Sequence, residues 1–353
     1  MSCCSFKYPT KGLVLDLDKA INFGILGCGV IAAAHAAVLK ELSGAKLIGV
    51  ADSVIENAES FAKKHGITPC SSYEQMLSDD NIDAICVCTP SYFHEQNAID
   101  AMDHGKHVVL EKPMALTTAA CDRIFEKCKS SGKLLTVISQ MRFSEDITKV
   151  KRLIEENSFG KISICELSMK YYRDPDYYAK SNWRGTLKYD GGGALINQGI
   201  HGIDLIQYLL GDISKLHAMT KTSTHKIEAE DTMTAIVEFE SGTLGTIIAS
   251  TCAYPGFDRR IRLHGDRGYV ILRENYIEEL MINGEKIDVA PIDATIATAS
   301  SNAVKNITFH KAQFKNFIDA INNGTKIVVD AVEGKRAVDI VERIYRSAKE
   351  NKQ

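Results

Sequence analysis

The sequence predicts an α/β protein in two parts: a parallel sheet covered by helices on both faces, followed by an α/β domain with a large, open, mostly antiparallel sheet. From Ile21 to about Phe143, short continuous apolar runs alternate with helical segments, as in a parallel sheet buried on both faces. After Phe143 single apolar residues alternate with polar ones, as in strands with one buried face. Two amphipathic helical stripes close the chain.

The composition bounds the class of protein. The chain has 353 residues, of which 45% are hydrophobic, and is long enough for two domains with sizeable cores. Its formal charge of -3 provides no basic surface of the kind that binds nucleic acid or anionic membranes. No stretch approaches the roughly 20 apolar residues of a membrane helix, and the first 20 residues lack the apolar core of a signal peptide. We therefore expect a cytoplasmic protein.

The cysteines and histidines do not indicate a disulfide scaffold or a metal site. The ten cysteines are scattered and include no C-x-x-C pair with a second cysteine pair at zinc spacing, so we expect reduced thiols. Cys86 and Cys88 lie two apart in an apolar run, and Cys28 sits between two glycines; we interpret them as small buried residues. The ten histidines are also dispersed, and no metal is expected.

The first half is predicted as strands alternating with helices. Strands are expected in the apolar runs that begin at Ile21, Leu47, Ala84 and Val108. Helices are expected after the first three runs, the second helix ending near Gly66 and the third lying around residues 98–102. In such a sheet the ligand binds at the C-terminal ends of the strands.

A glycine-rich turn after the first strand indicates a dinucleotide site. Residues 27–32 read GCGVIA, a G-x-G-x-x-A stretch between a strand and a helix. Gly27 would permit the tight turn, Gly29 would let backbone amides approach a pyrophosphate at the helix N-terminus, and Ala32 would allow close helix packing. Asp52, which closes the next strand, can accept hydrogen bonds from ribose hydroxyls and would repel a 2'-phosphate, which favours NAD over NADP. These features predict a Rossmann fold.

The second half is predicted as a sheet closed by two helices. In residues 232–240, TMTAIVEFE, every second side chain from Met233 to Phe239 is apolar, and Ser241-Gly242 and Asn283-Gly284 supply hairpin turns. An open sheet needs cover on its exposed face, so we expect self-association through it. The closing stripes are Phe314, Phe317, Ile318 and Ile321, then Ala337, Ile340, Val341 and Ile344. We divide the chain into an arm (1–20), a first domain (21–143) and a second domain (144–353).

Several ordered motifs together resemble one family. They are the glycine-rich turn, CTPSYFH (88–94), GKHVVLEKPM (105–114), QMRF (140–143) and WRGTLKYDGGGALINQGIHGID (183–204). With them the chain resembles the glucose-fructose oxidoreductase and inositol dehydrogenase (Gfo/Idh/MocA) family from Ile21 nearly to its C-terminus. The resemblance implies a Rossmann domain for NAD, a substrate-binding domain whose open sheet forms homodimers or homotetramers, and a dehydrogenase for sugars or polyols. It also implies that NAD is retained tightly in some members.

The resemblance implies catalytic roles for three residues. In relatives the lysine of the E-K-P triplet reaches the substrate hydroxyl and the nicotinamide, and the bond to proline is often cis, which for X-Pro costs only about 0.5–1 kcal/mol. Lys112 matches that lysine and would stabilise a developing alkoxide. His201 is the expected base, because histidine suits proton transfer near neutral pH, and Asn197 would orient the substrate. The alternative is that Lys112 and His201 exchange roles. Asn197 and His201 are four residues apart, so we expect them on one face of a helix, with Asp204 on the same stripe.

The full set of candidate residues extends these three. Cofactor contacts are expected from Gly27, Gly29, Val30, Ile31, Asp52, Thr89, Pro90, His94, Glu111, Lys112 and Gln140. Substrate contacts are expected from Arg173, Tyr178, Trp183, Arg184, Asn197 and His201, with Tyr177 as a further aromatic candidate. Glu111 would hold the loop or the cofactor ribose.

One departure from the family pattern narrows the substrate. Inositol and simple polyol relatives usually carry aspartate where this chain has Asn197. The form NQGIH looks more like the branch with UDP-N-acetylglucosaminuronate 3-dehydrogenase and glycoside 3-dehydrogenases. We therefore expect oxidation of the C3 hydroxyl of a glucose-type pyranose, as a glycoside or a nucleotide sugar. The alternatives are an inositol or polyol dehydrogenase and a dinucleotide-binding sensor without catalysis.

Overall fold

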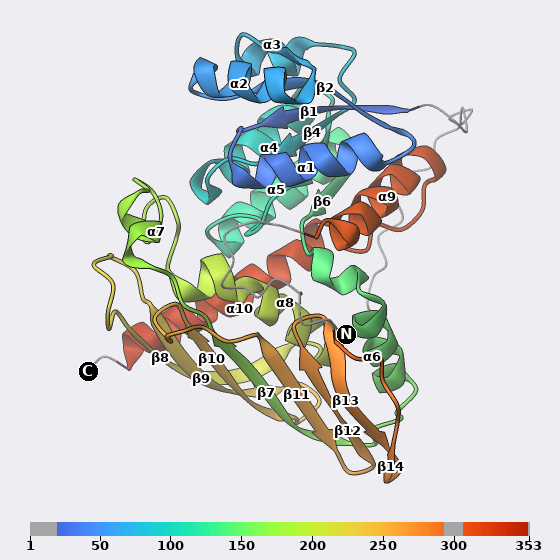
Figure 1. Ribbon diagram of the computed structural model, residues 1–353, viewed down its shortest axis with the longest axis vertical. Coiled ribbons are helices and arrows are strands. Elements are labelled where there is room, and N and C mark those ends of the chain that lie inside the picture. The colour runs from blue at the N-terminus through green and yellow to red at the C-terminus, as the bar shows by residue number, and fades with distance from the viewer. Residues whose placement is uncertain (1–19, 293–305, 352–353) are drawn as a thin grey trace.

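The computed structural model describes residues 20–292 and 306–351. The predicted N-terminal arm lies, except for Ala20, outside the described residues. Two sheets organise the chain, one above the other in the view of Figure 1, with helices around and between them. No helix within the described ranges combines the length and the apolar character of a membrane span.

The first sheet is parallel, as predicted. Its six strands run in the order β3-β2-β1-β4-β5-β6, and every neighbouring pair is parallel. The strands are β1 (Ile21–Leu26), β2 (Ala45–Ala51), β3 (Thr68–Pro69), β4 (Ala84–Val87), β5 (His107–Leu110) and β6 (Leu135–Val137). The helices between them are α1 (Val30–Glu41), α2 (Ile55–His65), α3 (Tyr73–Ser78), α4 (His94–Asp103) and α5 (Thr118–Ser131). The strand order reverses between β1 and β4, which is where a parallel sheet of this kind opens a crevice for a ligand.

The second sheet has eight strands in the order β14-β13-β12-β11-β7-β10-β9-β8, all antiparallel neighbours except β7 and β10. Its strands are β7 (Ile162–Lys170), β8 (Ile213–Lys221), β9 (Thr232–Phe239), β10 (Leu244–Ser250), β11 (Arg260–Gly265), β12 (Gly268–Arg273), β13 (Tyr276–Ile282) and β14 (Glu285–Lys286). The predicted turns are confirmed: Gly242 has φ +82° between β9 and β10, and Asn283 and Gly284 have φ +54° and +81° between β13 and β14.

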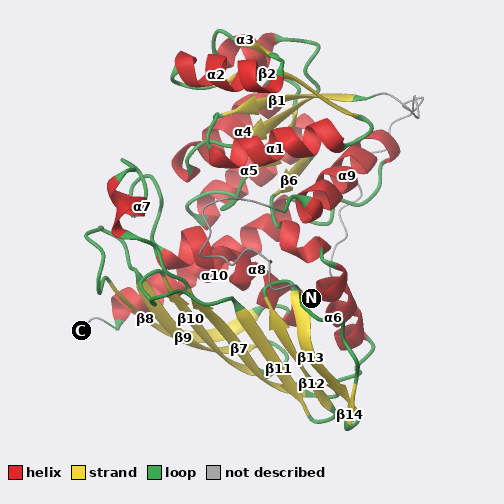
Figure 2. Cartoon of the chain, viewed as in Figure 1, coloured by secondary structure: helices red, strands yellow, loops and turns green. Residues whose placement is uncertain are grey.

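Only one face of this sheet is covered by described helices. The helices α6 (Glu145–Glu155), α8 (Ile200–Leu210) and α10 (Ala331–Glu350) lie on the side that faces the first sheet (Figure 2). The predicted alternation holds, because Met233, Ala235, Val237 and Phe239 are all buried. On the other face Ile236 is 61% exposed, and Met219 on β8 and Leu244 on β10 are exposed as well.

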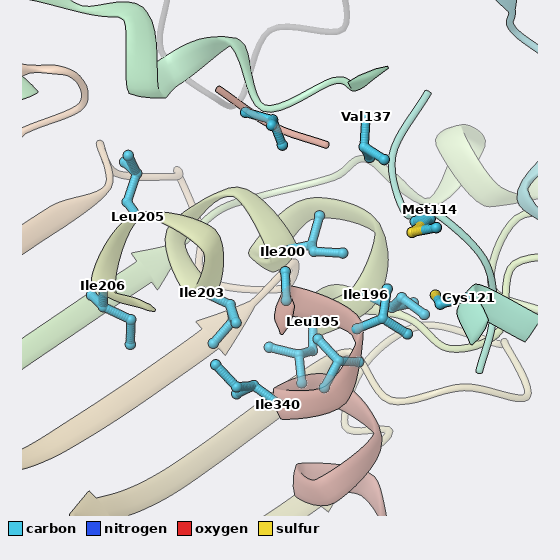
Figure 3. Packing of buried hydrophobic residues seen from close by; sticks show 14 of the residues in the cluster. Met114, Cys121, Val137, Leu195, Ile196, Ile200, Ile203, Leu205, Ile206 and Ile340 are labelled. Carbon is cyan, nitrogen blue, oxygen red and sulfur yellow. The ribbon is translucent and has the colours of Figure 1, made fainter. Parts of the chain in front are cut away.

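A continuous apolar core joins the two sheets. Met114 and Val137 from the first domain pack near Ile196 and Ile200 from the second, as Figure 3 shows, in a single cluster of buried residues. The helix α9 (Thr308–Asn323) also crosses between the domains, because it follows the second sheet in the chain but packs against the first. Its Phe314 lies 6.1 Å from the ring of Phe23 on β1. Burial of this shared core holds the C-terminal ends of the first sheet opposite α8.

Candidate active site

A cleft of about 2190 Å³ lies where the two domains meet at the C-terminal ends of β1, β4 and β5. Almost all of the predicted site residues line it. They are Gly27, Gly29, Val30, Ile31, Asp52, Thr89, Pro90, His94, Glu111, Lys112, Gln140, Arg173, Tyr177, Trp183, Arg184, Asn197 and His201. Tyr178 alone among them lies outside the lining.

The glycine turn leaves space for a ligand at the start of α1. Gly27 has φ +89°, and a Cβ there would lie 2.9 Å from the backbone of Cys88, so the turn needs glycine. A Cβ on Gly29 would meet no described atom within 4 Å, which leaves open space beside the loop. The helix begins at Val30 without a side-chain cap, so its first amides are available to an anion. This geometry suits a pyrophosphate.

Asp52 is held at the edge of the same cleft by the backbone around it. One carboxylate oxygen accepts a hydrogen bond from Cys28 N at 2.8 Å, and the other accepts from Val54 N at 2.9 Å. The oxygen that accepts from Val54 N also accepts from Asn57 Nδ2 at 3.4 Å, whereas the oxygen that accepts from Cys28 N keeps a lone pair for a further donor such as a ribose hydroxyl. On the opposite side, Gln140 has a buried amide oxygen without a hydrogen-bond partner among the described residues. The lining therefore fits a dinucleotide and leaves a polar atom for it to satisfy.

His94 connects two loops of the cleft rather than pointing into open space. It is 1% exposed, and its ring nitrogens lie 2.9 Å from Thr89 O and 2.6 Å from Pro113 O. It thereby ties the loop after β4 to the loop after β5 on which Lys112 lies.

Glu111 anchors Lys112 from behind. Its carboxylate accepts from Lys112 N at 3.1 Å and from His35 Nε2 on α1 at 2.8 Å. Burial by itself raises the pKa of Glu111, but the hydrogen bond and charge of His35 and the charge of Lys112 outweigh it and hold the pKa at about 2. The carboxylate is therefore ionised and fixed, in a position that holds the loop. The Lys112-Pro113 bond is cis, as the family resemblance suggests.

Lys112 reaches across the domain boundary. Its ammonium donates to Asn197 O at 2.8 Å. Burial lowers the pKa of Lys112, an effect opposed by Glu111 and Asp190 and strengthened by Arg173 and Arg184.

The helix expected to carry Asn197 and His201 is irregular, and the expected single stripe is wrong. Residues Ala194–Gly199 form a π-helical turn (η3), and the regular helix α8 begins only at Ile200. Both side chains line the cleft, but Asp204 points elsewhere and accepts two hydrogen bonds from Arg142 at 2.7 and 2.9 Å. His201 and Asp204 both lie in the regular helix α8, so the departure of Asp204 comes from its ion pair with Arg142 and not from the π-helical turn.

His201 is poised as a neutral group. No described residue hydrogen-bonds its ring, which is open to the cleft. Burial lowers the pKa of His201 well below its ordinary range, and the positive charges of Lys112 and Arg259 act in the same direction. A neutral imidazole can accept a proton at neutral pH.

The lobe of residues 171–190 forms the outer wall, with helix α7 (Pro175–Ala179) at its tip (Figure 1). The Arg184 guanidinium lies 4.4 Å from the ring centre of Tyr177 and 5.2 Å from that of Trp183, and Arg173 donates to Gln198 Oε1 at 2.8 Å. Arg184 lines the cleft and has no carboxylate within ion-pair distance among the described residues.

Tyr178, which was expected to contact substrate, packs behind that wall. Its hydroxyl lies 2.9 Å from Thr251 Oγ1, and its ring lies 4.8 Å from that of His225. His225 in turn contacts Arg173 O at 2.9 Å. Consecutive residues on a helix point about 100° apart, and of these two tyrosines only Tyr177 lines the cleft.

Four neighbours of the site were missed from the sequence. They are His35, Asp190, Gln198 and Arg259, of which Gln198 and Arg259 line the cleft. Arg259 is 1% exposed and pairs with Glu274 and Asn275. Asp190 and Gln198 stand inside the quoted motif next to Asn197, so their position was a usable signal; His35 and Arg259 come from distant segments that only the fold brings near.

Taken together, the lining offers a dinucleotide half and a polar half rich in cations and aromatic rings. Between the two halves, Lys112 can stabilise a negative charge and His201 can accept a proton. Such an arrangement suits oxidation of an alcohol with hydride transfer to a bound dinucleotide.

Comparison with known proteins agrees with this geometry. A family model described as "Oxidoreductase family, NAD-binding Rossmann fold" matches residues 21–139, and one described as "Oxidoreductase family, C-terminal alpha/beta domain" matches residues 151–353. The WlbA dehydrogenase from Bordetella pertussis, solved with NADH and UDP-GlcNAcA, superimposes with a TM-score of 0.85 and 31% identity over 94% of this chain and 96% of its own.

Two further relatives define the range of similarity. The scyllo-inositol 2-dehydrogenase (NAD(+)) of Bacillus subtilis is 28% identical over 89% of this chain and 90% of its own length. A levoglucosan dehydrogenase solved with NADH and levoglucosan shares the fold, with a TM-score of 0.83 and 21% identity over 94% of this chain and 98% of its own. Because the two family models cover both domains, the chain belongs to the Gfo/Idh/MocA oxidoreductase family, and its first domain is an NAD-binding Rossmann fold.

Proposed function

We propose that the protein is an NAD-dependent dehydrogenase that oxidises the C3 hydroxyl of a glucose-type pyranose to a ketone. The observation that carries the proposal is the meeting of Lys112, Asn197 and His201 in the cleft that also holds the glycine turn. The similarity to the WlbA dehydrogenase supports a sugar substrate, because that structure holds UDP-GlcNAcA.

The residues of this chain divide the work of alcohol oxidation. Bound NAD supplies the hydride acceptor. His201 takes the hydroxyl proton, since its lowered pKa leaves the ring neutral and open to the cleft. The Lys112 ammonium stabilises negative charge on the sugar oxygen, held in place by Glu111 behind it. Asn197 orients the sugar ring through its amide.

The cationic wall favours a sugar with an anionic handle. Arg184 stacks on Tyr177 and Trp183 without a carboxylate partner among the described residues, so a diphosphate or a sugar carboxylate would neutralise it. We therefore place a nucleotide-linked or acidic pyranose ahead of a neutral glycoside. An inositol is the second candidate, supported by the similarity to scyllo-inositol 2-dehydrogenase.

The first experiment measures NADH formation with a panel of UDP-sugars, simple glucosides, glucose and myo-inositol, with NADP replacing NAD as cofactor control. Oxidation of a UDP-sugar or glucoside, with product analysis showing a 3-keto sugar, would support the proposal. Oxidation of inositol alone would favour the second candidate. No oxidation, with NAD bound, would point to a sensor.

The second experiment tests the residues. Lys112→Ala and His201→Ala should each lower turnover by roughly 10²-fold or more, because each removes stabilisation of the transition state. Lys188→Ala is the matched control, since Lys188 is exposed on the same lobe but does not line the cleft. Unchanged turnover in both cleft variants would refute the assignment.

The state of the cofactor is a separate proposal. We propose that NAD stays tightly bound and is recycled by a second carbonyl substrate. Mass spectrometry of the denatured purified protein tests this, and absence of nucleotide would contradict it.

A further inference from the structure

Asp190 is a buried carboxylate directly behind the site. It precedes Gly191, is 2% exposed and does not line the cleft. One oxygen accepts from Gly185 N at 2.8 Å, and the other accepts from Asn197 Nδ2 at 2.7 Å. Both of its oxygens are thus engaged with the lobe and the π-helical turn that form two walls of the cleft.

This contact decides which way the Asn197 amide points. An ionised carboxylate only accepts hydrogen bonds, so the Asn197 amino group must face Asp190 and its oxygen must face the opposite way. There Asn197 Oδ1 accepts from Gln198 Nε2 at 3.1 Å, and Gln198 Oε1 accepts from Arg173 Nη2 at 2.8 Å. The Asp190 carboxylate at the end of this row therefore determines which group donates and which accepts in each of these hydrogen bonds.

The carboxylate also acts on the charges of the site. Asp190 and Glu111 favour the charged form of Lys112, while Arg173 and Arg184 oppose it. Removal of Asp190 would therefore leave Lys112 among cations with only Glu111 to offset them.

Burial makes this carboxylate costly to the fold. It raises the pKa of Asp190 to about 6, against the opposing effects of Gly185, Asn197, Lys112 and Arg184. A folded-state pKa above the unfolded value means that protonation favours folding, and that this stabilisation is lost as the pH rises through about 6. At neutral pH the charge thus opposes folding, which is unlike a residue kept for stability.

We propose that Asp190 is a positioning residue of the site that acts through Asn197. It fixes the Asn197 amide so that the amide oxygen points away from Asp190 and toward Gln198 and Arg173. This inference rests on the proposed function, because it assigns Asn197 to the substrate. The ligand group that Asn197 would then contact is a sugar hydroxyl next to the reacting carbon.

Asp190→Asn tests the idea with almost no change of shape. Gly185 N and Asn197 Nδ2 bind different oxygens of Asp190, and asparagine replaces one of those oxygens with an amino group, so it cannot accept from both donors where they stand. We expect kcat to fall by about 10-fold, the value of one hydrogen bond to a charged group, while NAD affinity measured by fluorescence is unchanged. The thermal midpoint at neutral pH should not fall, because a charge that opposes folding is removed.

A double-mutant cycle separates positioning from a general structural effect. In an Asn197→Ala background, Asp190→Asn should change kcat by about 2-fold or less, because the residue it acts through is gone. Asp330→Asn is the control: Asp330 accepts two hydrogen bonds, both from backbone amides to one oxygen at the start of α10, and it does not line the cleft, so kcat should stay at the wild-type value.

The outcomes distinguish the two proposals. Three results would overturn the positioning role while leaving the proposed function intact. They are full turnover in Asp190→Asn, effects of the two substitutions on kcat that simply multiply in the cycle, and failure of Asp190→Asn to fold. Unchanged turnover in Asn197→Ala would remove Asn197 from the mechanism and this inference with it. Unchanged turnover in Lys112→Ala and His201→Ala would instead overturn the proposed function.

Discussion

Arg142 should be a sensitive position for stability outside the cleft. Its side chain is 0% exposed, and it donates from two nitrogens to Asp204 on α8 and from a third to Glu333 on α10 at 2.6 Å. Because Arg142 follows the last strand of the first sheet, this ion pair fixes the two domains against each other. Arg142→Met keeps much of the volume and removes the charge.

The structure sets the expected magnitude. Removal of one partner from a buried ion pair costs about 3–5 kcal/mol, since it leaves an uncompensated charge. Glu333 keeps a second partner, Arg336 at 2.9 Å, so the unpaired charge is mainly that of Asp204, whose side chain is 5% exposed. We therefore expect a loss near the lower end, about 3 kcal/mol of unfolding free energy.

The assay is urea unfolding followed by the fluorescence of Trp183, the only tryptophan of the chain. The double variant Arg142→Met/Asp204→Leu should recover most of the loss, because an apolar pair of similar volume can replace a buried ion pair at little cost. Arg336→Met, at a side chain that is 34% exposed, is the control and should cost about 1 kcal/mol or less. A double variant as unstable as the single one would refute the reasoning.

Three further predictions concern the cofactor, the pH dependence and assembly. Asp52→Ser should shift the ratio of kcat/KM for NAD and NADP toward NADP by about 10-fold or more, because we propose that the Asp52 carboxylate faces the ribose 2'-position; an unchanged ratio would contradict the assignment. The oxidation rate should fall as the pH decreases through about 6, where Asp190 takes up a proton, and this step should be missing from the pH profile of Asp190→Asn, since burial places protonation of His201 at a lower pH. Ile236→Lys, on the open face of the second sheet, should lower the mass measured by light scattering if the protein is a homodimer or homotetramer through that face, and an unchanged oligomer would exclude it.

The alternation of strands and helices and the change of period after Phe143 were enough to predict both sheets, because apolar periodicity reports directly which faces are buried. The glycine turn and Asp52 line the cleft, as the local backbone geometry at the strand ends predicted, and their contacts with the cofactor stay a prediction. The position of α9 was not predictable, since its stripe around Phe314 shows only that it is buried and not which sheet buries it.

The errors at the site arose where local spacing gave way to tertiary contacts. The stripe that joined Asn197, His201 and Asp204 was predicted from helical spacing alone, which does not show that Asp204 forms an ion pair instead of lining the cleft. Asp204 then serves an ion pair whose partner lies 62 positions away in the chain. Tyr178 was chosen by residue type, which cannot tell a ring in the cleft from one packed behind it.

The lobe that carries the expected sugar contacts has a consequence for how this enzyme could change. Arg173, Trp183 and Arg184 come from one continuous stretch of chain, which is held by hydrogen bonds of Tyr178 to Thr251 and of His225 to Arg173 O. The glycine turn and Asp52 come from a separate stretch that shares none of these fastenings. After gene duplication, one copy could therefore evolve specificity for a different sugar through substitutions within one segment, while its nucleotide site stays unchanged.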